Sequence, residues 1–94
     1  SLTNEFESFV NFTNHGIEFW FARDLQHLLG YSEWRNFNQV ISKAKTACET
    51  SDHLINDHFV YINKTIPMPK GAMKEIPDFM LTRYACYLID RPFS

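Results

Sequence analysis

The feature that most constrains this chain is the stretch of residues 33–49, where apolar side chains recur every three or four positions. Stepped at about 100° per residue, the helical period, these side chains fall within an arc of about 140°. The pattern predicts one long amphipathic helix with a continuous face that must be buried against the rest of the chain. The apolar face consists of Trp34, Phe37, Val40, Ile41, Ala44, Ala47 and Cys48.

The opposite face of this predicted helix carries amides, hydroxyls and cations, and residues 34–48 contain no carboxylate. Exposed helices usually mix acids with bases, because oppositely charged pairs four residues apart stabilise them. Guanidinium and amide groups form paired hydrogen bonds with guanine and adenine in the major groove. We therefore favour a DNA-reading face, and an ordinary solvated face is the alternative. The candidate DNA-binding residues on it are Arg35, Asn36, Asn38, Gln39, Ser42, Lys43 and Lys45.

Position along the helix separates these candidates by role. Residues near the start of a recognition helix reach base edges most often. We expect Arg35, Asn36, Asn38 and Gln39 to contact bases. We expect Lys43 and Lys45, which lie later in the helix, to meet phosphate.

The first third of the chain predicts a hairpin and a short helix. Short aromatic and β-branched runs at 9–12 and 17–20 flank a turn-forming cluster, which indicates a β-hairpin. Residues 21–29 have helical periodicity, and Gly30 follows at the position where helices commonly close in a left-handed conformation. Ser32 is the expected N-cap of the long helix. Residues 1–8 fit either a short helix or a frayed end.

The last third predicts a second hairpin and a final helix. After a polar linker at 50–57, a strand begins at residue 59, ends at 62 or 66, and is broken by the segment 67–71. A returning strand begins near 74–76, with Pro77 restricted to an edge or bulge. The helix at 82–89, capped by Thr82 and ended by Pro92, is apolar almost all round, so we expect it to be buried.

Three lysines in the second hairpin complete the candidate DNA surface. The segment 58–74 contains no acid, and the two acid-free segments together hold six of the nine basic residues. Charged residues can also block edge-to-edge pairing of strands, and both roles are compatible. We expect the hairpin and the long helix to converge on one electropositive surface, with the hairpin of residues 59–76 contacting phosphate. The hairpin candidates are Lys64, Lys70 and Lys74.

These elements predict an α+β fold: a small, winged-helix-like domain. An N-terminal β-hairpin precedes a helix-turn-helix, a second hairpin forms the wing, and a buried helix ends the domain. A chain of 94 residues is too short for a second core, so residues 1–94 are expected to form a single domain.

No catalytic or metal-binding pattern is present in the sequence. The chain has three glycines and no glycine-rich phosphate loop, so we expect no enzyme and no cofactor. His53 and His58 lack cysteine partners at zinc spacing. Cys48 and Cys86 fit apolar packing, and a redox pair is the alternative. Arg83, within the apolar final helix, is expected to serve the structure.

Hydropathy predicts where the protein is located, and net charge suggests an alternative to DNA binding. No apolar run is long enough for a membrane span and no signal-peptide pattern opens the chain, so we expect a cytoplasmic protein without membrane contact. The net charge is −2. Because residues 1–33 hold an excess of acids, a protein-interaction module is the alternative to DNA binding.

Several segments resemble a known family. Residues 20–25 (WFARDL), 29–37 (LGYSEWRNF) and above all 81–89 (LTRYACYLI) resemble the N-terminal domain of the BRO family, in the branch that includes damage-inducible proteins and phage antirepressors. Residues 43–45, 47–49 and 57–59 strengthen the likeness, which extends from about residue 6 to 89.

The resemblance implies a winged-helix-like DNA-binding module, fused to a variable C-terminal region, in a bacterial, phage or prophage regulator of transcription. The chain is then expected to be a fragment of a longer protein. The expected partners are double-stranded DNA and, in the alternative, a protein of DNA metabolism. A single module of this size binds DNA weakly, so a homodimer or the C-terminal region is expected to supply the remaining affinity. In the alternative function, the domain of a DNA-damage-response or antirepressor protein contacts proteins without binding DNA directly.

Overall fold

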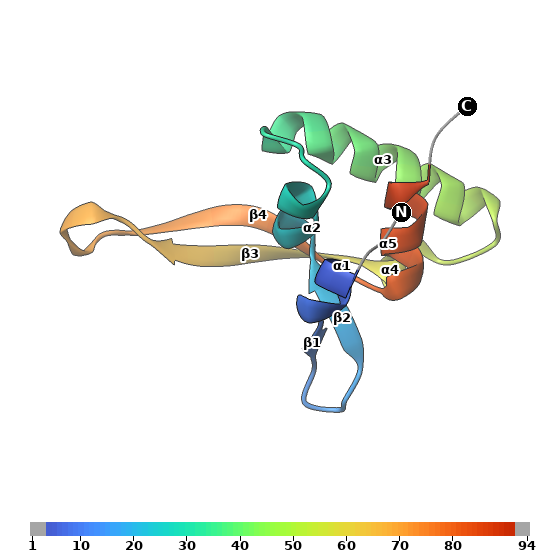
Figure 1. Ribbon diagram of the computed structural model, residues 1–94, viewed down its shortest axis with the longest axis horizontal. Helices are drawn as coiled ribbons and strands as arrows, with labels where there is room; N and C mark the ends of the chain where they lie inside the picture. Colours follow the sequence, from blue (N-terminus) through green and yellow to red (C-terminus); the bar gives the residue numbers. More distant parts are fainter. Residues whose placement is uncertain (1–3, 92–94) are drawn as a thin grey trace.

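A computed structural model describes residues 4–91 and shows a helical body from which a long two-stranded arm projects (Figure 1). The predicted α+β class is confirmed. In chain order the elements are α1 (Asn4–Ser8), β1 (Asn11–Phe12), β2 (Glu18–Phe21), α2 (Ala22–Leu28), α3 (Trp34–Thr50), α4 (Ile55–His58), β3 (Phe59–Pro67), the 3-10 turn η1 (Pro69–Gly71), β4 (Met73–Leu81) and α5 (Arg83–Asp90).

The four strands form one antiparallel sheet in the order β1-β2-β4-β3. β2 pairs with β4 only at Trp20↔Leu81 and Phe21↔Met80, so the outer part of β4 has β3 as its partner. The β3–β4 hairpin pairs over its full length, from Phe59↔Leu81 to Pro67↔Met73. It is therefore longer than the predicted 59–76. Pro77 lies beyond the β2 pairing, as its missing N–H requires.

The core lies between one face of the sheet and the helices. Trp20, Phe59 and Leu81 are buried on that face, α5 packs against β2 and β4, and α3 packs against α5. The ring of Phe6 stacks on Trp20 with centroids 4.3 Å apart, and the Trp20 indole N–H donates to the Phe6 carbonyl over 2.9 Å. These contacts anchor α1, so the first residues of the described chain form a short helix.

The long predicted helix is confirmed as α3, with one correction at its start. Phe37, Ile41, Ala44 and Cys48 are buried, as their period requires. The N-cap is Glu33 in extended conformation, and its side chain makes no capping hydrogen bond. The prediction of Ser32 as the cap was wrong, because the extended backbone continues one residue further before α3 begins.

The connection between α2 and α3 follows the prediction. Gly30 has a φ of 81°, and its N–H donates to the His27 carbonyl while the Tyr31 N–H donates to the Gln26 carbonyl. This left-handed turn satisfies carbonyls that a helix end would otherwise leave unpaired. It brings α3 back across the body from the end of α2 (Figure 1).

The C-terminal part contains one element that the sequence reasoning missed. The short helix α4 occupies the end of the segment predicted as a polar linker. α5 follows β4 directly, and the Thr82 hydroxyl accepts the Ala85 N–H over 3.1 Å, as expected of an N-cap. Four residues of α5 are buried, Arg83 and Tyr87 are exposed, and Tyr84 and Asp90 are partly buried. Pro92, the predicted stop, lies outside the described residues.

The described residues contain neither a candidate membrane span nor a candidate metal-binding cluster. Between residues 4 and 91, no helix combines the length and the apolar character needed to cross a membrane. In the same range, no group of three or more histidine, cysteine, aspartate or glutamate side chains is arranged to hold a metal ion.

Candidate nucleic-acid interface

The outer face of α3 is open to solvent along most of the helix. Six of its predicted DNA-binding residues are exposed, and Lys45 is partly buried. The Arg35 side chain is 83% exposed, and its contact with Glu33 at 3.9 Å is a surface ion pair that holds the guanidinium weakly. The exposed residues are Arg35, Asn36, Asn38, Gln39, Ser42 and Lys43.

The two edges of this α3 face look toward different parts of the molecule. On one edge, the Lys45 ammonium lies 4.4 Å from the centre of the Phe79 ring of β4, so this edge faces the base of the arm. On the other edge, Lys43 borders a shallow groove that Tyr31 of the α2–α3 turn and Arg91 after α5 also line. The seven candidate residues therefore extend too far around the circumference of α3 for all of them to contact one groove of DNA.

Tyr61 adds an exposed aromatic side chain beside the Lys45 edge. It is 58% exposed, its ring meets Phe79 edge-on at 5.6 Å, and its hydroxyl donates to Asn63 Oδ1 over 3.0 Å. Sequence reasoning missed Tyr61 because an aromatic residue in a strand is usually core. The sequence offered one signal. Tyr61 alternates with Val60 and Ile62 along the strand, so its side chain lies on the face opposite to theirs.

The lysines of the arm do not all join the α3 face. Side chains alternate between the two faces of a strand, and directly paired residues share a face. Tyr61 and Phe79 form a pair on the α3 side of the arm, whereas Lys64 and Lys74 are paired with Ile76 and Ile66 on the opposite side. The expected convergence on one surface was therefore wrong for these two lysines.

Lys70 occupies a separate position at the tip of the arm. It lies in η1 with a φ of 66°, a left-handed conformation that completes the turn between the strands. It is exposed, far out on the projecting arm (Figure 1).

Lys64 is committed to an interaction inside the protein. Its ammonium lies 3.0 Å from Oδ2 of Asp78, whose side chain is fully buried, and 3.8 Å from the centre of the Phe21 ring. The contact with Oδ2 is ionic and does not have the angles of a hydrogen bond. Oδ1 of Asp78 accepts the N–H groups of Arg23 and Phe79 over 3.1 and 2.8 Å.

Asp78, on strand β4, thus caps the first turn of helix α2. The N-cap residue of α2, Phe21, has no side chain that can accept, and Arg23 is in the first helical turn. A carboxylate at a helix N-terminus satisfies a free N–H and interacts favourably with the helix dipole. The Arg23 side chain strengthens the same junction: its Nε donates to the Pro77 carbonyl over 3.0 Å and its guanidinium lies 4.0 Å from the Trp34 ring.

Arg83 has the structural role expected of it. Its guanidinium binds Glu7 of α1 through NH1 at 2.6 Å and Glu18 of β2 through Nε at 2.9 Å. These hydrogen bonds lower the pKa of the Glu7 carboxyl. Two acids of the N-terminal third are therefore paired within the protein.

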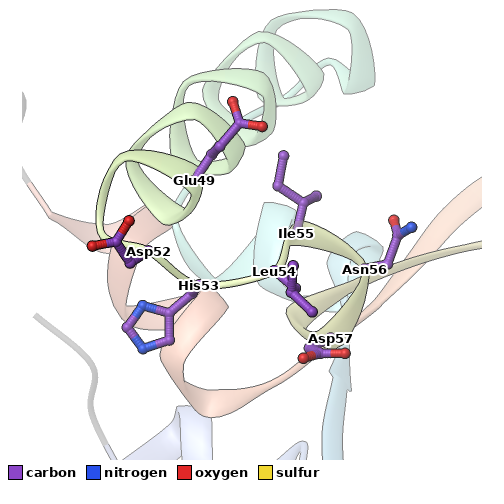
Figure 2. Close-up of a pocket in the computed structure, with 7 residues that line it drawn as sticks. All are labelled: Glu49, Asp52, His53, Leu54, Ile55, Asn56 and Asp57. Atoms are coloured by element: carbon purple, nitrogen blue, oxygen red, sulfur yellow. The ribbon is translucent and has the colours of Figure 1, made fainter.

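An acidic depression lies at the C-terminal end of α3. Figure 2 shows Glu49 and Asp52 at the helix end and Asp57 on α4, around a depression also lined by His53. This region marks the limit of the carboxylate-free surface. Its carboxylates repel polyanions.

A histidine cluster packs beside this depression. The His53 and His58 rings are 5.5 Å apart between centroids, and both contact Tyr84. His58 Nδ1 is 2.7 Å from the Thr82 hydroxyl that caps α5. The cluster joins α4 to the start of α5.

Comparisons with known proteins identify the family. Residues 9–89 match the model of the BRO family N-terminal domain. The chain is 45% identical over 84 residues to DNA damage-inducible protein D of Escherichia coli (strain K12), a match that covers 89% of this chain and 31% of that protein. The chain thus spans about a third of the length of this curated relative. No solved structure matches it. The resemblance noted in the sequence is confirmed: the chain belongs to the BRO family, as an example of its N-terminal domain.

Proposed function

We propose that this domain is the DNA-binding module of a cytoplasmic bacterial or phage regulator, with α3 entering the major groove. The observation that carries the proposal is the exposed face of α3, which presents amide and guanidinium groups and no carboxylate from Trp34 to Cys48. The order of α2, turn, α3 and projecting hairpin is that of a winged helix-turn-helix.

The position of each side chain suggests its role. Arg35, Asn38 and Gln39 lie in the first half of α3, where recognition helices meet base edges, and Asn36 lies beside them. The Ser42 hydroxyl donates to the Asn38 carbonyl over 3.2 Å, so toward DNA it is an acceptor only. Lys43 and Lys45, on the two edges, are placed for phosphates on either side of a groove.

The arm supplies a smaller share of phosphate contacts than its charge suggests. Lys70 at the tip is free to reach a backbone that runs past α3. Lys64 is neutralised by Asp78, and Lys74 projects from the far face, so these two contribute less to DNA affinity than the lysines of α3.

The name of the relative fits a regulator that acts after DNA damage. The relative is a DNA damage-inducible protein, and this chain corresponds to about a third of it. A single module of this size binds DNA weakly, so a second copy or another region supplies the remaining affinity.

A protein-interaction module without direct DNA binding is the second candidate. The exposed acids Glu49, Asp52 and Asp57 around one depression favour it, because they form a surface suited to a basic protein segment. The net charge of −2 points the same way.

Binding of a fluorescently labelled duplex, followed by anisotropy at two salt concentrations, separates the candidates. With about four to six phosphate contacts, affinity should fall about 10²- to 10³-fold between about 50 and 200 mM salt. The triple variant Arg35→Ala, Gln39→Ala, Lys43→Ala should lose binding at low salt while keeping its circular dichroism spectrum. The control Lys74→Ala, on the far face of the arm, should change affinity by less than about threefold. Absence of binding by the wild type at low salt would leave the second candidate.

A further inference from the structure

One face of the sheet is largely apolar and partly exposed, and the buried carboxylate of Asp78 on this face meets the N-terminus of α2. The face toward the helices is buried at Trp20, Phe59 and Leu81. On the other face, Ile17 is 60% and Val60 45% exposed, and both line an apolar groove with Phe19 and Met80. Residues that pair directly across two strands share a face, so the strand register assigns the other residues of this face. This open sheet face consists of Ile17, Phe19, Phe21, Val60, Ile62 and Met80.

The open sheet face continues along the arm. Ile66 and Ile76 lie on the same side, paired with Lys74 and Lys64. The one cation at the centre of the face, Lys64, is neutralised by the buried carboxylate of Asp78 at 3.0 Å. Figure 1 shows the arm projecting with α2 and α3 on one side of it. A contiguous apolar surface of this kind on a small domain marks a contact with another macromolecule.

Charge at the two ends of the open sheet face is opposite in sign. At the base, the exposed carboxylate of Asp57 borders the apolar groove. At the outer end, Lys74 projects from this face and Lys70 lies at the tip. Ile66 lies six positions after Val60 along β3, so the apolar part is about 20 Å long. A two-fold axis through its middle places the basic end of one arm over the acidic base of another copy.

We propose that the open sheet face is the surface through which two copies of this chain form a symmetric dimer, with their arms antiparallel. In such an isologous contact each pairing occurs twice, so Lys74 meets Asp57 of the second copy on both sides. The apolar residues between them are removed from water, and the neutral Lys64–Asp78 pair at the centre avoids repulsion between like charges. The complementary ends favour a second copy over an unrelated partner.

The proposed dimer leaves the candidate DNA surface free. α3 packs over the opposite face of the sheet, so both α3 helices remain exposed on the outside. Dimerisation and DNA binding are therefore separate properties, and each can fail without the other.

Sedimentation equilibrium without DNA tests the dimer. At about 100 μM the wild type should sediment at twice 11.1 kDa. Val60→Glu should raise the dimer dissociation constant at least about 10-fold. Tyr61→Glu is the matched control, because Tyr61 is adjacent to Val60 and exposed but lies on the other face of the sheet. The Tyr61→Glu variant should remain dimeric. A wild type that is monomeric at this concentration, or equal effects of the two substitutions, would overturn the proposal.

Charge-reversal variants and cysteine variants test the arrangement of the dimer. Asp57→Lys and Lys74→Glu should each weaken it, and the double variant should restore it. Ile62→Cys, near the proposed two-fold axis, should form an intermolecular disulfide under mild oxidation, whereas Asn63→Cys on the other face should not. The native Cys48 and Cys86 are fully buried and do not interfere. Cross-linking through Asn63→Cys alone would show that copies associate through a different surface and would refute this arrangement.

Discussion

Replacing Asp78 with alanine should destabilise the domain strongly, because one buried carboxylate holds three partners. Its Oδ1 accepts the N–H groups of Arg23 and Phe79, and Lys64 lies 3.0 Å from its Oδ2. The side chain links α2, β4 and β3, the elements that set the arm against the helix-turn-helix. Alanine leaves two N–H groups without an acceptor and an ammonium without its counter-charge.

The magnitude follows from these losses. Loss of a helix N-cap costs about 1 kcal/mol, and a buried N–H left without an acceptor costs about 1–3 kcal/mol. The Lys64 side chain is 30% exposed, so water partly replaces its partner. We expect a total of about 2–4 kcal/mol, a large share of the roughly 5–15 kcal/mol that stabilises a typical domain. The melting temperature should fall by about 10–25 °C.

Thermal and urea unfolding followed by circular dichroism measure this loss. Asp78→Asn keeps an acceptor oxygen and should cost about half as much as Asp78→Ala. A double-mutant cycle with Lys64→Met should give a coupling energy of at least about 1 kcal/mol. A loss below about 0.5 kcal/mol for Asp78→Ala, or additive effects in the cycle, would show that Asp78 does not hold these partners together.

The remaining predictions concern other parts of the fold. Gly30→Ala should cost about 1–2 kcal/mol, because Gly30 has a φ of 81° with open space around it and the strain is purely conformational; Gly30→Asn should cost less, as urea unfolding can show. Glu7→Gln should flatten the acid limb of the stability curve: Arg83 lowers the pKa of folded Glu7, so the stabilisation present at neutral pH is lost as pH falls through that pKa, and a wild type and variant that lose stability in parallel on acidification would contradict this. Burial raises the pKa of Cys86 to about 12 and also raises the pKa of Cys48, so both thiols should resist alkylation at about pH 8 until urea unfolds the chain; rapid labelling of the native protein would contradict their burial.

Most of the fold could be predicted from local patterns. The helical period of residues 33–49, the glycine after α2 and the Thr82 cap each depend on interactions within a few residues. The length of the arm could not be predicted, because Asn63, Lys64 and Pro77 weaken the strand pattern and only the pairing across the hairpin shows that β3 and β4 continue past them.

The candidate site could be predicted in part, for a related reason. The exposed face of α3 follows from its own periodicity. The face on which Lys64 and Lys74 lie depends on strand register and on which side α3 packs, and both are tertiary properties. The role of Asp78 could not be predicted either, because its partner Arg23 is 55 residues away in the chain.

NMR titration of the isotope-labelled domain with a short duplex shows whether the outer face of α3 contacts DNA. We expect amide shifts to change chiefly between residues 35 and 46 and in η1 at the arm tip, and the changes to vanish at high salt. Unchanged spectra at low salt, or changes confined to the open sheet face and the acidic depression around Asp57, would contradict this expectation.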